Sequence, residues 1–126
     1  EDREEYDGFM DLFSDLMDAV ISRNYMGALE CAEAMSALES REKQKAFCTF
    51  ASECIRKIFL IQQNLPQIAD VPDEEYEFYQ KAAQGCGRKF CSRSIPNIEN
   101  VVAMIDRNVN SKILFCDLVN RMFLSV

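Results

Sequence analysis

The sequence predicts an all-α fold, a compact bundle of five to six helices in a single domain spanning residues 1–126. Apolar residues recur at intervals of three and four along most of the chain, which is the period of an amphipathic helix. The alternation of apolar and polar residues that marks half-buried strands is missing, and so is any internal repeat. With 48% hydrophobic and 28% charged residues in 126, the chain can build one hydrophobic core.

The first two helices are predicted from apolar stripes on either side of a short polar break. Apolar residues from Phe9 to Val20 recur at helical spacing, with acidic residues on the other face. After "SRNYMG" the same period resumes at Met26 and continues to about Leu38. The break is too short for any connection other than an antiparallel hairpin.

The longest apolar stripe predicts a central third helix. Ser40 suits its N-cap, because a serine side chain can accept a hydrogen bond from the unpaired N–H groups of the first turn. Pro66 cannot continue a helix and disfavours helical geometry in the residue before it, so we expect this helix to end near Asn64. The apolar positions of the stripe are Phe47, Phe50, Ala51, Cys54, Ile58 and Ile61.

Two further helices are predicted after the linker "PQIADVPDEE". Pro72 followed by three acidic residues marks a helix start, because proline suits the first turn and the helix dipole favours anions there. This fourth helix should bury Tyr76, Tyr79 and Ala83 and stop at "GCGRKF", where two close glycines favour a turn. A fifth helix should begin near Pro96. Its apolar residues are Ile95, Ile98, Val101, Val102 and Ile105.

The stretch "DRNVNSKILFCDLVNRMF" joins the fifth helix to the last one. Asn108 can take the left-handed conformation that closes one helix, and Asn110 can cap the start of the next. The last helix is apolar nearly all round, so it must be buried nearly all round. Either it lies centrally in the bundle, or it keeps a face for another chain. The candidate subunit-interface residues are Phe115, Val119, Arg121 and Phe123.

The charge distribution argues against nucleic acid as a direct partner. The formal net charge is −7, and acidic residues gather in residues 1–18 and in "DVPDEEYE", where they would repel a phosphate backbone. We expect the three cations of "GRKFCSR" to be solvated. No apolar run approaches the roughly 20 residues of a membrane span. The opening residues lack an initiator Met and a signal-peptide layout, so we expect a cytoplasmic fragment.

Six cysteines are expected to be reduced and mostly buried, because a chain of this size can fold without disulfide bonds. Cys86 and Cys91 are spaced C-x4-C, but a structural zinc site needs four nitrogen or sulfur ligands, and the sequence holds no histidine. Common nucleotide, metal and nucleophile motifs are missing. Glu74 and Glu77, one turn apart, are expected to be solvated rather than an acid–base pair. We therefore expect no catalytic residue, metal, cofactor or small-molecule substrate.

Two segments resemble a known family. "REKQKAFCTFASECIRKIFL" and, some forty residues on, "IENVVAMIDRNVNSKILFCDL" are similar to the C-terminal helical domain of bacterial DNA polymerase III clamp-loader subunits, most closely the delta-prime type of Bacteroides-like bacteria. The likeness covers most of the chain from about Phe9. The positions that carry it are Arg41, Glu42, Lys45, Phe47, Ile55, Arg56, Asn108, Asn110, Leu114, Phe115 and Asp117.

The resemblance implies a collar domain, in which the helical domains of five subunits lie side by side in a ring while separate ATPase modules open the sliding clamp and place it on primed DNA. It implies that this chain binds other clamp-loader subunits, and that an ATPase-like module belongs upstream of these residues. It also places part of the last helix at a subunit contact. The "SRS" at Ser92–Ser94 is not equated with the family's Ser-Arg-Cys motif, because it lies in a different domain and ends in Ser.

Two other classes of protein stay open from the sequence. One is an unrelated all-α adaptor that takes up a partner helix in a groove. The other is a small helical enzyme or metal protein that uses Cys86 and Cys91. A delta subunit or the gamma/tau ATPase would end in a similar bundle, so the sequence does not decide which clamp-loader subunit the parent is.

Overall fold

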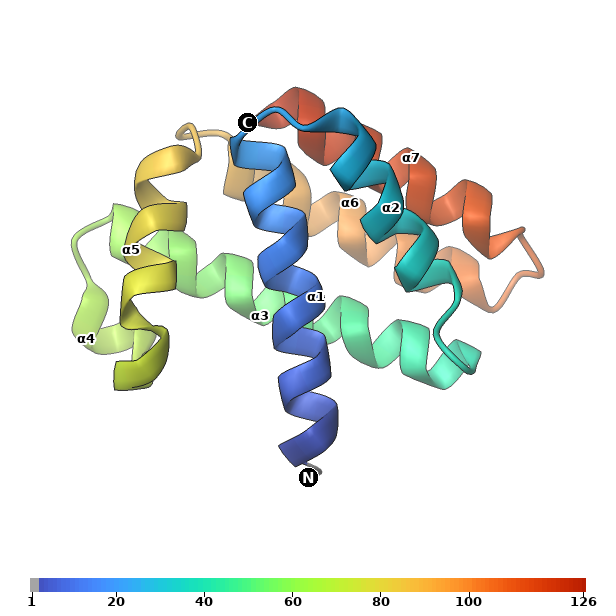
Figure 1. Ribbon diagram of the computed structural model, residues 1–126, viewed down its shortest axis with the longest axis horizontal. Helices are drawn as coiled ribbons and strands as arrows, with labels where there is room; N and C mark the ends of the chain where they lie inside the picture. Colours follow the sequence, from blue (N-terminus) through green and yellow to red (C-terminus); the bar gives the residue numbers. More distant parts are fainter. Residues whose placement is uncertain (1–2) are drawn as a thin grey trace.

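The computed structural model describes residues 3–126, and these residues form helices joined by short turns, without any strand (Figure 1). This confirms the all-α prediction. Six helices have ten residues or more, as expected, and a seventh, α4, is a single turn inside the predicted linker. The elements are α1 (Arg3–Ile21), α2 (Tyr25–Ser36), α3 (Arg41–Gln62), α4 (Pro66–Ala69), the 3₁₀ helix η1 (Asp73–Glu75), α5 (Tyr76–Gly85), α6 (Phe90–Ile105) and α7 (Ser111–Ser125).

Helix α3, the longest at 22 residues, is the element that joins the two sides of the molecule. It packs against α6 on one side and against α4 and α5 on the other (Figure 1). Helix α7 lies between α6 and α2, and α2 in turn packs on α1. The predicted central position of the third helix is therefore confirmed, and the last helix is enclosed by two neighbours of the same chain.

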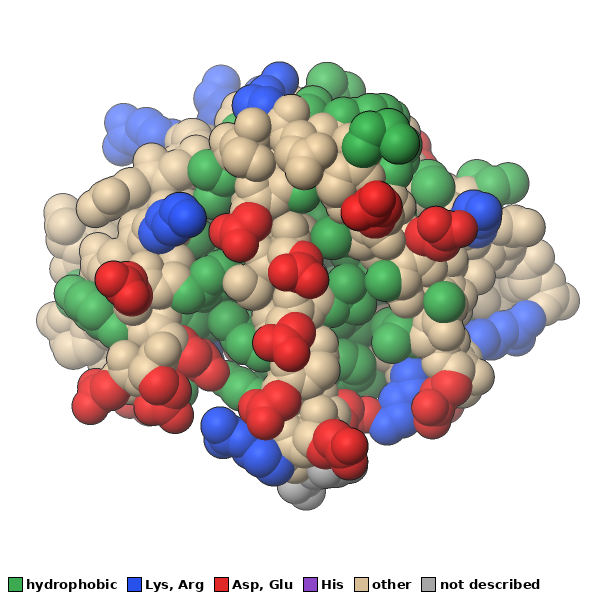
Figure 2. Space-filling model, in the orientation of Figure 1, with side chains coloured by type: hydrophobic (Ala, Val, Ile, Leu, Met, Phe, Trp, Pro, Cys, Tyr) green, Lys and Arg blue, Asp and Glu red, His purple; other side chains and the backbone are tan. Residues whose placement is uncertain are grey.

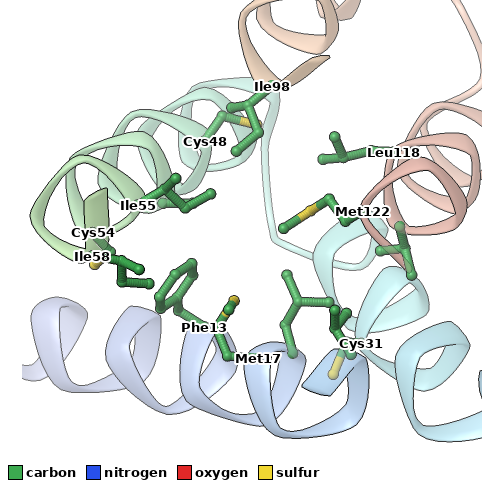
Figure 3. Close-up of a cluster of buried hydrophobic side chains, with 14 of the residues drawn as sticks. Phe13, Met17, Cys31, Cys48, Cys54, Ile55, Ile58, Ile98, Leu118 and Met122 are labelled. Carbon is green, nitrogen blue, oxygen red and sulfur yellow. The ribbon is translucent and has the colours of Figure 1, made fainter. Parts of the chain in front are cut away.

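Every α-helix contributes side chains to one continuous core. Phe13 of α1 points toward Ile58 of α3, while Leu118 and Met122 of α7 approach from the other side (Figure 3). Phe13, Ile58 and Met122 are completely buried. Burial of this kind stabilises each large side chain by roughly 1.5–3 kcal/mol relative to exposure, so this cluster, more than helix propensity, holds the helices together.

Several residues predicted to be buried are more exposed than expected. Met26 is 67% exposed, because the buried face of α2 is formed by residues 28, 31, 32 and 35. Tyr76 is 53% exposed; α5 buries Tyr79, as predicted, together with Ala82, whereas the predicted Ala83 is only partly buried. Phe50 is only partly buried, at the edge of an aromatic group in which its ring centroid lies 5.4 Å from that of Tyr6.

The helix ends show the capping chemistry that the sequence predicts. Ser40 accepts a hydrogen bond from the Lys43 N–H at 3.1 Å, which confirms it as the N-cap of α3. Beyond the end of α3, Asn64 takes a positive φ of 63°. Asn108 has a φ of 58° in the turn after α6, as predicted for a residue that closes a helix. Asparagine tolerates this left-handed region better than most residues, because its short polar side chain bonds locally.

The turn between α5 and α6 forms for reasons that the sequence did not reveal. No glycine in residues 3–126 has a positive φ. A Cβ on Gly85 would instead meet Ile21 Cγ2 at 2.7 Å, so this glycine lets α5 approach the end of α1.

Helix α6 begins at Phe90 rather than near Pro96, because Phe90 and Cys91 are buried and hold the first turn in place. Pro96 therefore lies inside the helix, where it cannot donate to the carbonyl four residues earlier.

Candidate interface on the final helix

The start of α7 is fixed by the predicted asparagine cap. Asn110 accepts a hydrogen bond from the Ile113 N–H at 3.1 Å, which confirms it as the N-cap. Two of the four candidate interface residues, Phe115 and Val119, are 0% exposed, because they face the core between α2 and α6. In this structure they have no surface to offer to another subunit. Their burial matches the other arrangement foreseen for the last helix, a central position in the bundle.

The other two candidate residues, Arg121 and Phe123, lie at the surface. Arg121 Nε is 2.8 Å from Asp117 Oδ2, one turn earlier on α7, and both side chains are well exposed. Phe123 is half-buried, and its ring centroid lies 5.2 Å from that of Tyr25. The guanidinium of Arg23 stands 4.6 Å above the Phe123 ring, and its Nη1 donates to the Phe123 carbonyl at 3.0 Å. The end of α7 is thus tied to the start of α2.

This junction carries exposed apolar side chains, and we name Tyr25, Met26, Phe123 and Leu124 the α2–α7 corner. Leu124 is 78% exposed and Met26 67% exposed. Figure 2 shows hydrophobic side chains gathered at the upper edge of the molecule, over the start of α2 and the end of α7. The Tyr25 hydroxyl donates to Asn120 Oδ1 at 2.6 Å, which fixes the ring. Rigid aromatic and aliphatic surface of this type favours protein–protein contact.

The two segments that carry the family resemblance lie side by side. The Arg41 guanidinium, at the start of α3, donates to the Asn108 side-chain oxygen in the α6–α7 turn. One turn further along α3, Lys45 Nζ donates to Asp106 Oδ2 at 2.9 Å. That hydrogen bond raises the pKa of Lys45 above its usual range. The sequence did not predict these contacts, because the partners are more than sixty residues apart.

The C-x4-C pair does not form a metal site in the part of the chain that is described. Cys86 and Cys91 are 7% and 1% exposed. Burial raises the pKa of Cys86 to about 12 and that of Cys91 to about 11, so both thiols stay protonated near neutral pH and are poor nucleophiles and ligands. Gln62 holds the region together, since its Nε2 donates to the carbonyls of Ala83 and Cys86 at 3.1 and 3.2 Å. Across residues 3–126, no group of three Cys, Asp or Glu side chains could hold a metal ion.

A second polar contact that the sequence did not predict lies between α1 and η1. The Tyr6 hydroxyl donates to Glu75 Oε2 at 2.6 Å across 69 residues of sequence. Burial, together with this bond to a carboxylate, raises the pKa of Tyr6 above its usual range. Glu74 and Glu77, the possible acid–base pair, are both exposed, as expected for solvated surface. The Tyr6–Glu75 pair joins α1 to η1, and the nearby thiol of Cys54 also contributes to the raised pKa of Tyr6.

None of the helices formed by residues 3–126 combines the length and apolar character needed to cross a membrane. Comparisons of this chain with protein-family models, with curated proteins and with solved structures found no match. Its function must therefore be argued from the residues and their geometry.

Proposed function

We propose that this chain is a non-enzymatic assembly domain of a cytoplasmic bacterial DNA polymerase III clamp-loader subunit, of the delta-prime or delta type. In this role its helices bind the C-terminal domains of neighbouring subunits and so help to build the complex that loads the sliding clamp onto primed DNA. ATP hydrolysis and contact with the primer junction belong to other modules of such a complex. This domain then needs no cofactor, small molecule or direct nucleic-acid contact.

The resemblance segments support the choice of family. The "REKQKAF" start of α3 and the Asn-x-Asn turn before α7 are joined by the contacts of Arg41 with Asn108 and of Lys45 with Asp106. Two motifs that are distant in sequence are therefore in direct contact at the α6–α7 turn.

One observation carries the assembly role: the exposed apolar side chains of the α2–α7 corner. Leu124 and Met26 each leave two thirds or more of their surface uncovered, although the α7 residue Met122, two positions before Leu124, is completely buried. A neighbouring subunit that covered this corner would remove apolar surface from water, which favours association by roughly 25 cal/mol per Å². Tyr25 in this corner and Arg23 beside it belong to residue types that are enriched where proteins bind one another.

Co-purification with the C-terminal domains of the other clamp-loader subunits tests the proposal. We expect the wild-type chain to bind at least one of them and Met26→Glu with Leu124→Glu to lose that binding, because two charges would be buried without partners. Ile68→Glu is the matched control, since Ile68 is 61% exposed on α4, far from the corner. If no subunit domain binds the wild-type chain, the proposed function is wrong. If the corner variant binds as well as the control, the contact lies elsewhere.

A further inference from the structure

The net negative charge of the described chain is concentrated in its first two helices. Residues 3–36, which span α1 and α2, hold eight carboxylates and two cations. Residues 41–126 hold ten carboxylates and twelve cations, so the remainder of the molecule is close to neutral. Figure 2 shows acidic side chains in a column along α1, with further acidic groups over α2. A field of one sign over one face attracts a partner of the opposite sign.

Two adjoining hollows run along this acidic face and share Leu12. The first, of about 310 Å³, lies between the second half of α1 and α2. The second, of about 370 Å³, follows the first half of α1 and is closed by Leu38, Glu39 and Lys43. Together they form what we call the α1–α2 groove. From Glu4 to Asp18 it follows α1 for about 21 Å at 1.5 Å per residue, enough for roughly four turns of a second helix.

The groove has an apolar floor and an acidic rim. Hydrophobic side chains are visible between the acidic groups of α1 and α2 in Figure 2. The floor is formed by Phe9, Leu12, Ala19, Cys31, Ala34 and Leu38. The carboxylates that line it are Glu4, Glu5, Asp15, Asp18, Glu30 and Glu39.

The rim carboxylates are only partly neutralised within the chain. Among the residues that line the two hollows, Lys43 is the one cation, and it pairs with Glu5. Within residues 3–126, no Lys or Arg lies within ion-pairing distance of Asp15, Asp18 or Glu30. These three side chains flank the first hollow, with Asp15 and Asp18 on α1 and Glu30 on α2. Their charge is therefore available to a ligand.

The chemistry of the groove selects one class of ligand. A metal ion is unsuitable, because no three ligating side chains converge in the described residues. A nucleic acid would be repelled by the rim. An apolar floor between two helices, about 21 Å long, is the geometry that accepts an amphipathic helix through its i, i+3, i+4 and i+7 side chains. The carboxylates along the edges then select lysine and arginine on the flanks of that helix.

We propose that the α1–α2 groove binds an amphipathic helix of a partner protein, with aliphatic side chains on the floor and Lys or Arg side chains against Asp15, Asp18 and Glu30. The inference does not depend on the clamp-loader proposal, because it uses a different surface. None of the four residues of the α2–α7 corner lines the groove. The groove reaches the start of α2 at Asn24 and Gly27 and then follows the side of α2 that carries Glu30, Cys31 and Ala34.

A designed peptide is the probe for this site. It is a fluorescein-labelled helix of about 16 residues, long enough to fill the groove, with Leu at i, i+3, i+4 and i+7 and Lys on both flanks. One comparison peptide keeps the Leu positions and replaces every Lys by Glu, and another has the same composition in scrambled order. Fluorescence anisotropy is measured with the full 126-residue chain. We expect the Lys-flanked helix to bind at least about tenfold more tightly than either comparison peptide.

Matched variants locate the binding. Asp15→Lys with Glu30→Lys reverses the rim charge, and we expect it to weaken binding of the Lys-flanked peptide by about tenfold or more. Glu53→Lys with Glu99→Lys makes the same charge change on exposed positions of α3 and α6, outside the groove, and should change binding less than about twofold. Ala34→Gln fills the groove without altering charge and should also weaken binding. Circular dichroism confirms that each variant is folded.

Several results would overturn the inference. These are equal binding of the scrambled peptide, no measurable binding of the Lys-flanked helix, and equal losses in the groove and control variants. Sedimentation could also show that the wild-type chain is a dimer and that the Asp15→Lys, Glu30→Lys variant is a monomer. In that case the ligand of the groove would be a second copy of this chain and not a partner helix. Failure of the clamp-loader proposal is seen separately, because subunit co-purification is tested with the variants of Met26 and Leu124.

Discussion

Helices α1 and α7 both place a completely buried phenylalanine in the core, Phe13 and Phe115, but they present different surfaces to solvent. The outer side of α1 carries a row of carboxylates, whereas α7 leaves Ile113 and Leu124 66% and 78% exposed near its two ends. The contrast between its polar and apolar faces therefore indicates which side of α1 is buried. The orientation of α7 is set by its neighbours α2 and α6, which cover the residues between its ends.

The largest expected effect tests whether α7 belongs to the core as fully as α1 does. Phe115→Ala and Phe13→Ala should each lower the free energy of unfolding by about 3–5 kcal/mol, because each leaves a cavity at a site with no exposure. Phe123→Ala, at the half-buried end of α7, should cost nearer about 1 kcal/mol. Urea denaturation measures all three. A small loss for Phe115→Ala together with a large one for Phe13→Ala would show that α7 is not part of the folded core.

The contrast between these helices also explains which parts of the fold could be predicted. The stripe from Phe9 to Val20 and the caps Ser40 and Asn110 are local patterns, and local patterns determine helix positions and ends. The start of α6 could not be predicted this way. It depends on the burial of Phe90 and Cys91 beside α3, and Pro96 falsely suggests a later start.

The candidate interface was the least predictable feature for the same reason. In a helix that is apolar nearly all round, the sequence does not say which residues face neighbours of the same chain and which are left exposed. Phe115 and Val119 are buried, while Leu124, which was not among the candidates, is exposed. The only signal that pointed to Leu124 was its place beyond the last buried position, Met122. The α1–α2 groove likewise depends on how two helices are placed, which no local pattern contains.

Buried thiols allow the two sides of the core to be compared by pH. Burial raises the pKa of Cys54, near Phe13 of α1, to about 11, and that of Cys48, near Ile98 of α6, to about 12 (Figure 3). In the unfolded chain these thiols ionise near their ordinary value of 9.0, so unfolding releases protons above that pH. Below pH 9 the ionisation of these thiols should not change the free energy of unfolding. Above pH 9 the free energy of unfolding should fall as pH rises, by up to about 1.4 kcal/mol per pH unit for each thiol.

Urea denaturation under reducing conditions from pH 7.5 to 11 measures this slope. Between pH 9 and 11, Cys48→Ala and Cys54→Ala should each reduce this slope by about the contribution of one thiol. Cys116→Ala is the control, because Cys116 is only partly buried. A slope that is unchanged in Cys48→Ala would indicate that water reaches the core between α3 and α6.

The cap of α7 should contribute less than its core residues. Asn110→Ala removes the side-chain acceptor for the Ile113 N–H and should cost about 1 kcal/mol. Asn110→Asp and Asn110→Ser keep an acceptor and serve as controls that should stay within about 0.5 kcal/mol of the wild type. Thermal unfolding followed by circular dichroism measures the change. If all three substitutions cost the same amount, the side-chain hydrogen bond is not what stabilises the start of α7.

The smallest expected effect compares two exposed ion pairs at i and i+4, one on each helix. On α7, Asp117 precedes Arg121 with 2.8 Å between Oδ2 and Nε, and on α1, Arg3 precedes Asp7 with 3.2 Å between Nε and Oδ1. The acid-first order agrees with the helix dipole and the reverse order opposes it. Arg121→Gln should therefore cost about 0.3–0.5 kcal/mol, and Arg3→Gln about zero, because Arg3 places a cation at the start of a helix. High salt should remove the difference, since both pairs are exposed and screened. Equal losses for the two variants, measured by urea denaturation at low salt, would mean that charge order along the helix has no effect at these positions.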